Sequence, residues 1–299
     1  MSKPHPKALL GIMMMLMAML IFPFLDVIAK KLGQQGMPVM EAVWARLFLG
    51  ALMTAPVLYF IEGKSALRPR NQKLNAGRGL LIVMTTFFFF TAMKYQGIAE
   101  TLSIYFVQPI VITALAPLVL KEHVGARRWA AVVIGFVGVL VIIRPGLIAF
   151  NPGTVLAAGS GISSAFVLLI SRKLAGGSSA LANTFYTSLF GGLLASILML
   201  WQWQWPTPEQ WILMFVLSAI GTTANYLVIR AFEYCEASLL APFGYAEMIN
   251  AVIAGWYFFG DFPDRWTFVG VAILIGCALY ISNRERGLVT TQQPDPGRL

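Results

Sequence analysis

The chain has 299 residues, of which 58% are hydrophobic and only 12% are charged, and its formal net charge is +9. Because soluble domains carry about 25% charged residues, this composition excludes an ordinary soluble enzyme or binding module. Apolar stretches of about 18–25 residues, long enough to cross a bilayer as a helix, recur from one end of the chain to the other. The sequence therefore predicts an all-α polytopic membrane protein.

Ten transmembrane helices are predicted, separated by turn and charge clusters such as "GQQGMP" (33–38) and "EGKSALRPRNQKLNAGR" (62–78). In chain order they cover residues 8–29, 38–60, 77–95, 98–120, 129–143, 152–171, 180–200, 209–230, 237–259 and 264–283. The tail at 286–299, which includes "TTQQPDPGRL", is predicted to be disordered.

Lys and Arg residues determine the predicted orientation, because the cytoplasmic loops of membrane proteins are enriched in them. Most of the 22 Lys and Arg residues fall on one side of the predicted spans, and that side includes both termini. The N- and C-termini are therefore predicted to be cytoplasmic. The excess of positive charge then reflects topology, so a nucleic-acid partner is not expected.

Motifs of catalytic chemistry are missing from the sequence. There is no nucleotide-binding loop, no zinc-protease motif and no serine-hydrolase motif. His5 and His123 fall in polar segments, and Cys235 and Cys277 are isolated from one another. We therefore expect no enzyme activity, no cofactor and no metal site.

The chain contains a weak internal repeat, "LVLKEHVGARRWAAVVIGFVGVLVI" (118–142) and "WYFFGDFPDRWTFVGVAILIGCALYI" (256–281). Each copy has an apolar run, an acid, a turn, a Trp and a glycine-bearing span. Since each repeat holds five spans, an odd number, the two halves are predicted to be inverted. Inverted repeats are a transporter architecture, with the substrate site near the midplane. The predicted repeats cover 1–146 and 147–285.

This pattern resembles the EamA repeat of the drug/metabolite transporter superfamily over nearly the whole chain. Three stretches resemble the bacterial branch that contains exporters of amino acids and related metabolites: "FLDVIAKKLGQQGMPVMEAVWARLFLG" (24–50), "AETLSIYFVQPIVITALAPLVLKE" (99–122) and "ASLLAPFGYAEMINAVIAGWYFFGD" (237–261). The same branch contains uptake carriers for S-adenosylmethionine and riboflavin. The resemblance implies a multi-pass protein of the bacterial inner membrane. We expect a monomer or a weak dimer.

Three charged residues in the predicted spans stand out as candidates for the bundle interior: Asp26, Arg46 and Glu247. A charged side chain at the centre of a spanning helix costs about 2.5–3.5 kcal/mol on insertion scales, so such residues usually face the bundle interior or a wet cavity. A static ion pair between Arg46 and one acid is one interpretation. Two acids and one base leave a carboxyl group unmatched, however, which favours a functional role.

Polar and aromatic side chains on other spans complete the predicted substrate site. The candidate substrate-binding residues are Arg46, Glu247, Asp26, Tyr105, Gln108, Asn225, Asn250 and Phe90. Arg46 is the candidate partner of a substrate carboxylate. Glu247 and Asp26 are candidates either for binding an ammonium group or for carrying a coupling proton. Polar residues in membrane helices also hydrogen-bond neighbouring helices without any role in transport, which is the alternative for each uncharged candidate.

Two further acids, Glu122 and Asp261, are predicted to cap the helices that follow them. The predicted function is secondary transport of a small zwitterionic or amphipathic metabolite by alternating access, with amino-acid export as the leading interpretation. The first alternative is an uptake carrier for S-adenosylmethionine, riboflavin or a similar solute. The more distant alternative is a membrane scaffold that transports nothing. The expected partners are the solute, the lipid bilayer and protons as a candidate coupling ion.

Overall fold

The computed structural model describes residues 6–63, 71–120, 126–143, 151–174, 179–234, 246–273 and 275–276, and the secondary structure in these ranges is helical. The first five named elements are α1 (Pro6–Gln34), α2 (Val39–Trp44), the π-helical turn η1 (Ala45–Leu49), α3 (Gly50–Glu62) and α4 (Gln72–Ala92). They are followed by α5 (Ile98–Tyr105), α6 (Gln108–Leu120), α7 (Ala126–Ile143), α8 (Pro152–Leu174), α9 (Ala180–Met199), α10 (Pro208–Tyr234) and α12 (Ala246–Phe259). A further helical stretch covers 265–273.

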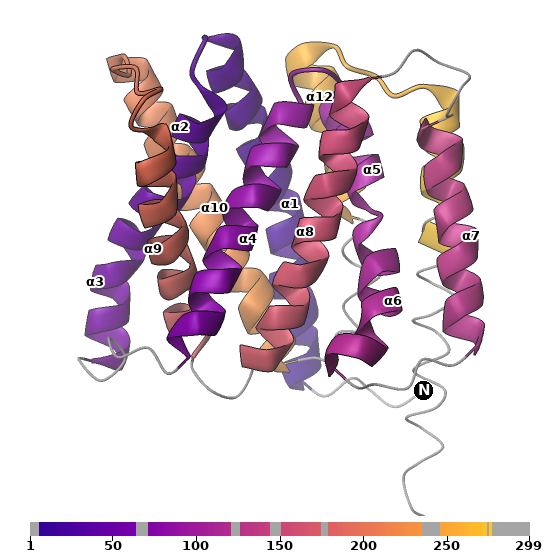
Figure 1. The fold of residues 1–299 in the computed structure, drawn as a ribbon, viewed down its shortest axis with the longest axis horizontal. Coiled ribbons are helices and arrows are strands. Elements are labelled where there is room, and N and C mark those ends of the chain that lie inside the picture. The colour runs from indigo at the N-terminus through magenta and orange to yellow at the C-terminus, as the bar shows by residue number, and fades with distance from the viewer. Residues whose placement is uncertain are drawn as a thin grey trace, which may run out of the picture.

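The described helices run side by side as one bundle (Figure 1). Six helical segments in the described ranges are long and apolar enough to cross a membrane. Every one of the ten predicted spans contains some described helix. The all-α membrane fold is confirmed, whereas the count of ten spanning helices stays a prediction.

Two predicted spans are interrupted instead of continuous. The second contains η1 between α2 and α3, and the fourth is broken between α5 and α6. The break in the fourth span follows from Pro109, which has no N–H to donate to the carbonyl of Tyr105 one turn earlier. Gly161 of α8 lies against that carbonyl, because a Cβ there would come 2.5 Å from the Tyr105 oxygen. Glycine on one helix thus accommodates a free carbonyl on the next.

The loop predicted at 62–78 is shorter than expected, since α4 begins at Gln72. Asn75 and Arg78 therefore lie in a helix, and their side chains are only 1% and 3% exposed. Their polarity is typical of a loop, but α9 supplies hydrogen-bond partners to Arg78: its Nη1 donates to Thr187 Oγ1 at 2.8 Å. The prediction failed because this partner is distant in sequence.

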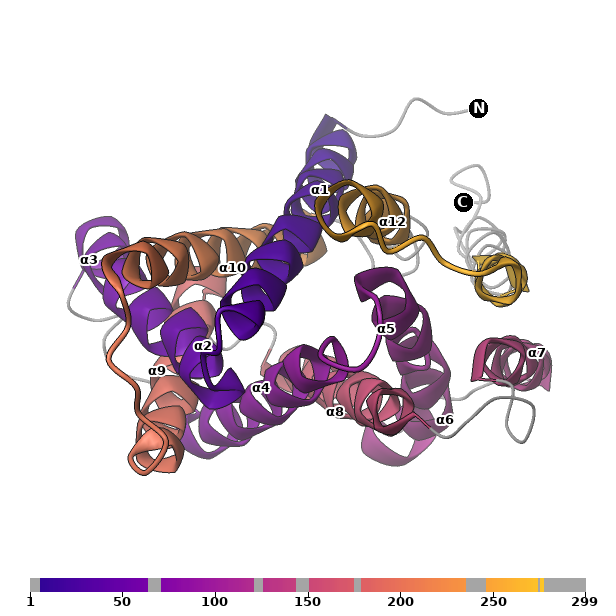
Figure 2. The same cartoon turned by 90° about the horizontal axis from the view of Figure 1, so that it is seen from above.

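Packing places α1 against α10 and α12, and α4 between α8 and α9 (Figure 2). The glycine-bearing helix α7 lies at the edge of the bundle in both views (Figures 1 and 2). It packs on the 265–273 stretch through glycines, since a Cβ at Gly138 would come 3.1 Å from the carbonyl oxygen of Gly270. Of the helices that carry the predicted site, α5 and α6 contact α7.

Candidate functional site

A cluster of charged and polar side chains lies inside the bundle, where four elements meet. It consists of Asp26 on α1, Arg46 on η1, Tyr105 on α5 and Glu247 on α12, and these groups lie close enough to interact electrostatically with one another. The Asp26 residue is 6% exposed, whereas Arg46 and Glu247 are half-buried. The fold therefore brings together three charges that are up to 221 residues apart in sequence.

Arg46 is oriented by neighbours from two helices. Its Nη1 donates to Thr86 Oγ1 on α4 at 3.1 Å, and its backbone carbonyl accepts from Ser218 Oγ on α10 at 3.4 Å. Gly221 leaves room for the side chain, because a Cβ there would come 3.3 Å from Arg46 Nε and 2.7 Å from Leu25 Cδ1. The π-helical turn that carries Arg46 is a rare distortion that occurs often at functional sites.

The two carboxylates near Arg46 are not tied to it directly. Among the residues that the structure describes, the ion pairs are Lys30–Asp261 and Lys31–Glu209, so Asp26 and Glu247 have none. Arg46 can accordingly offer its remaining N–H groups to a ligand, and a guanidinium binds a carboxylate through two parallel hydrogen bonds.

Tyr105 and Gln108 flank the break between α5 and α6 and bond to the same residue of α8. The Tyr105 and Ser164 hydroxyls share a hydrogen bond of 2.6 Å, and Gln108 Nε2 donates to Ser164 Oγ at 2.5 Å. The Tyr105 ring also packs edge-on against Phe89, with centroids 5.5 Å apart. Tyr105 therefore connects the charged cluster to the break in the fourth span.

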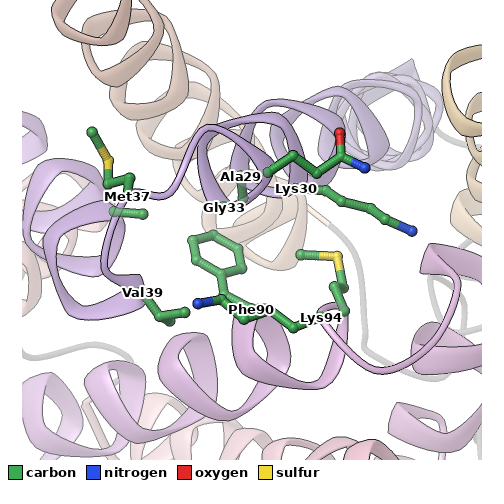
Figure 3. A pocket seen from close by; sticks show the side chains of 10 residues that line it. Ala29, Lys30, Gly33, Met37, Val39, Phe90 and Lys94 are labelled. Atoms are coloured by element: carbon green, nitrogen blue, oxygen red, sulfur yellow. The ribbon is translucent and has the colours of Figure 1, made fainter. Parts of the chain in front are cut away.

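A cavity of about 300 Å³ opens at one end of the bundle between α1, α2 and α4 (Figure 3). Its lining residues are Ala29, Lys30, Gly33, Gln34, Met37, Val39, Ala42, Phe90, Met93 and Lys94. Apolar groups thus dominate the wall, with Phe90 as the aromatic residue among them, and Lys30, Lys94 and Gln34 add polar groups.

The cavity lies one helical turn from the charged cluster on each of its three helices. Phe90 follows Thr86 by four residues on α4, and Ala29 follows Asp26 by three on α1. Ala42 precedes Arg46 by four residues on the antiparallel second span. One turn of helix is about 5.4 Å, so a solute in the cavity would lie directly above the charges.

Comparison with known proteins relates this geometry to a family. The sequence pattern of the EamA-like transporter family matches the chain twice, over residues 9–144 and 151–283. The chain belongs to the EamA-like transporter family. It is accordingly a membrane transporter of the drug/metabolite superfamily and not an enzyme.

Three relatives of this EamA-like transporter are named for different functions. It is 28% identical to the S-adenosylmethionine uptake transporter of Rickettsia prowazekii (strain Madrid E), over 92% of this chain and 93% of that one. It is 27% identical to the riboflavin transporter of Vibrio cholerae, over 95% of both chains. It is 20% identical to a pseudopaline exporter of Pseudomonas aeruginosa, over 93% of this chain and 97% of that one.

A solved crystal structure shares the fold of this transporter. The two superpose with a TM-score of 0.68 at 18% identity, and the match covers 94% of this chain and 98% of the other. At this level of identity, the likeness shows the fold alone.

The remaining predicted site residues of the transporter lie on helices that border the cluster. Asn225 is half-buried on α10, one turn beyond Gly221. Asn250 lies one turn beyond Glu247 on α12, and its Nδ2 donates to the Ala246 carbonyl of its own helix at 2.9 Å. In this conformation the Asn250 amide is therefore bonded within its own helix.

The helix-cap prediction for Asp261 is wrong. The Asp261 carboxylate forms an ion pair with Lys30 of α1, and Lys30 Nζ also lies 4.8 Å from the Phe259 ring centroid. The cap of the 265–273 stretch is Asp264, whose Oδ1 accepts from the Thr267 backbone N–H at 2.8 Å. Asp264 lies adjacent to the helix start, as a capping residue must. The other predicted cap, Glu122, lies outside the described residues.

Sequence reasoning missed a further buried acid, Glu41, in the second span of the transporter. Glu41 on α2 is 1% exposed and lies close to the backbone of Gln204. Its place near the predicted edge of the second span made it resemble an interfacial residue. In the described part of the chain, no group of three or more His, Cys, Asp or Glu side chains could hold a metal ion.

Proposed function

We propose that this transporter carries S-adenosylmethionine or a similar amino-acid-bearing cation across the inner membrane, in the direction of uptake. The observation that carries the proposal is the composition of the cluster: two carboxyl groups, Asp26 and Glu247, around one guanidinium, Arg46. S-adenosylmethionine has the complementary set, since it bears one carboxylate, one ammonium and one sulfonium group. Arg46 would bind the carboxylate, and the two acids would bind the cationic groups.

The cavity supports a solute with a flat, partly apolar portion. Phe90 lines it one turn above Thr86, and Met37 and Met93 line it farther from the cluster (Figure 3). Aromatic rings stack on Phe, and the thioether of Met makes favourable contacts with ring edges. An adenine ring in the cavity would allow the amino-acid portion of the same molecule to reach Arg46.

Amino-acid export is the second candidate, and the same cluster supports it. A simple amino acid needs Arg46 and only one of the two acids, so the other acid would be available to carry a coupling proton. Riboflavin is supported less well, because a neutral ring system leaves all three charges of the cluster without a partner, which is costly inside a membrane.

Transport would proceed by alternating access, with the Arg46 cluster exposed first to one side of the membrane and then to the other. The S-adenosylmethionine relative is named as an uptake transporter, and this supports the proposed direction. A solute of net charge +1 entering a cell would gain about 2.3 kcal/mol for each 100 mV of membrane potential. Uptake of such a cation therefore needs no further coupling ion.

The test is a panel of labelled solutes in proteoliposomes that contain the purified transporter. S-adenosylmethionine should enter, and a membrane potential that is negative inside should accelerate its entry. S-adenosylhomocysteine, which has the same parts without the sulfonium charge, should compete weakly. Preferential movement of riboflavin, or of neutral amino acids with no uptake of S-adenosylmethionine, would refute the proposal.

A further inference from the structure

Arg78 is a buried cation at the end of the bundle opposite to the cavity. Its side chain lies between α4 and α9 and is 3% exposed. Its Nη1 donates to Thr187 Oγ1 at 2.8 Å and to the Asn183 carbonyl at 3.4 Å. Its Nε has no hydrogen-bond partner, and no carboxylate pairs with the guanidinium within the described residues. Buried charges in proteins are normally paired.

Asn75 adds a complementary group on the same face of α4. It lies three residues before Arg78, is 1% exposed, and its Oδ1 has no hydrogen-bond partner in the described part of the chain. A buried donor and a buried acceptor thus lie one turn apart, and neither is satisfied. Buried polar groups without partners are few in proteins, and each calls for a cause.

A row of buried residues on α4 runs from Arg78 toward the proposed solute site. Residues 78, 82, 86 and 90 follow at four-residue intervals and are all buried, and α4 runs from one end of the bundle to the other (Figure 1). At 1.5 Å per residue, Arg78 lies about 12 Å from Thr86 and about 18 Å from Phe90 along the helix axis. Thr86 holds Arg46, so two guanidinium groups contact α4 at heights about 12 Å apart.

A tight contact between the two halves of the chain covers Arg78. Gly79 of α4 lies against α9, since a Cβ there would come 2.8 Å from the Gly191 backbone nitrogen. The two helices belong to the two separate stretches that match the family pattern. Alternating access requires the halves to separate at this end when they close at the cavity end. Separation of α4 from α9 would expose Arg78 and Asn75.

We propose that Arg78 and Asn75 form a second solute site, which binds the amino-acid head group at the end of the path opposite to the cavity. The free Nε–H of Arg78 would donate to the carboxylate, and Asn75 Oδ1 would accept from the ammonium group. This inference rests on the proposed function, because it assigns the site to the same class of solute. A purely structural Arg78 would instead only tie α4 to α9 through Thr187.

Arg78→Gln tests the site in proteoliposomes, with Thr187→Val as the matched control that removes the tie and keeps the charge. For Arg78→Gln, the initial rate at low S-adenosylmethionine should fall by about tenfold or more, the effect of losing a charge-assisted hydrogen bond. Decarboxylated S-adenosylmethionine should move at a rate within about twofold of wild type, the range of a neutral substitution. Thr187→Val should leave both rates within about the same range. An equal loss for both solutes, or the same loss in both variants, would overturn the proposal.

Thiol labelling keeps the proposal testable if Arg78→Gln fails to fold. In a background with Cys235→Ser and Cys277→Ser, Thr187→Cys should react with a membrane-impermeant reagent added on the α9 N-terminal side, and L-methionine should slow the reaction. If the thiol introduced by Thr187→Cys never reacts, or reacts at the same rate with and without L-methionine, the second site is overturned. If the wild-type protein does not carry S-adenosylmethionine, the proposed function fails. Protection of the thiol by L-methionine would still decide whether the Arg78 site exists.

Discussion

Replacing Gly221 by Ala should displace Arg46 and weaken solute binding without unfolding the protein. The new Cβ would come 2.7 Å from Leu25 Cδ1 and 3.3 Å from Arg46 Nε. Ordinary contacts between carbon atoms are about 3.5–4.0 Å, so Leu25 must move by about 1 Å. Leu25 is only 1% exposed and has little free space around it. Leu25 and Arg46 must therefore both shift, and Arg46 is the one of the two that would contact the solute.

The magnitude follows from the cost of overpacking, about 1–3 kcal/mol for an extra carbon in a filled interior. If this energy opposes the position of Arg46 that binds the solute, the dissociation constant should rise by about fivefold to a hundredfold, because each 1.4 kcal/mol changes it tenfold. Equilibrium binding of labelled S-adenosylmethionine to the purified transporter measures this change. The decarboxylated analogue should lose much less affinity, because it makes no contact with Arg46.

Gly77→Ala is the matched control, since a Cβ at Gly77 on α4 would meet no atom within 4 Å. This substitution should leave binding unchanged and stabilise the helix by up to about 1 kcal/mol through the higher helix propensity of Ala. The melting temperature of both variants separates an effect on binding from an effect on folding. Unchanged affinity and melting temperature in Gly221→Ala would show that Arg46 is not held as we describe.

Three further predictions concern charge and topology. Glu247→Gln should reduce gradient-driven uptake and solute exchange together, because the cationic groups lose a ligand; survival of exchange alone would assign the residue to proton transfer instead. Lys30→Asp and Asp261→Lys should each impair transport, because each breaks the ion pair between α1 and the segment after α12. The double variant, which restores a pair of opposite charges, should recover transport; no recovery would mean that the ion pair itself is not required. Reporter fusions after Arg128 and after Asn151, on the two sides of α7, should report cytoplasm and periplasm respectively, and the same signal from both would exclude the inverted repeat.

Much of the candidate site could be proposed from residue type and depth alone. Asp26, Arg46 and Glu247 stood out because charges are rare inside apolar spans, and the fold brings these three together. Their geometry could not be predicted in the same way. Nothing in the local sequence indicates that Arg46 lies in a π-helical turn, or that Gly221 on another helix leaves space for it.

Hydropathy alone determined that the chain is a bundle of membrane helices, because a bilayer requires long apolar segments whose backbone groups are bonded internally. Local chemistry also makes a helix break near Pro109 predictable, since proline lacks the N–H that a helix needs. The fate of the polar groups depended on tertiary structure. Arg78 resembled a loop residue until α9 supplied Thr187, and Asp261 resembled a helix cap until α1 supplied Lys30, 231 residues away. A side chain's partner decides whether its charge is solvated, paired or free for a ligand, and only the folded bundle determines the partner.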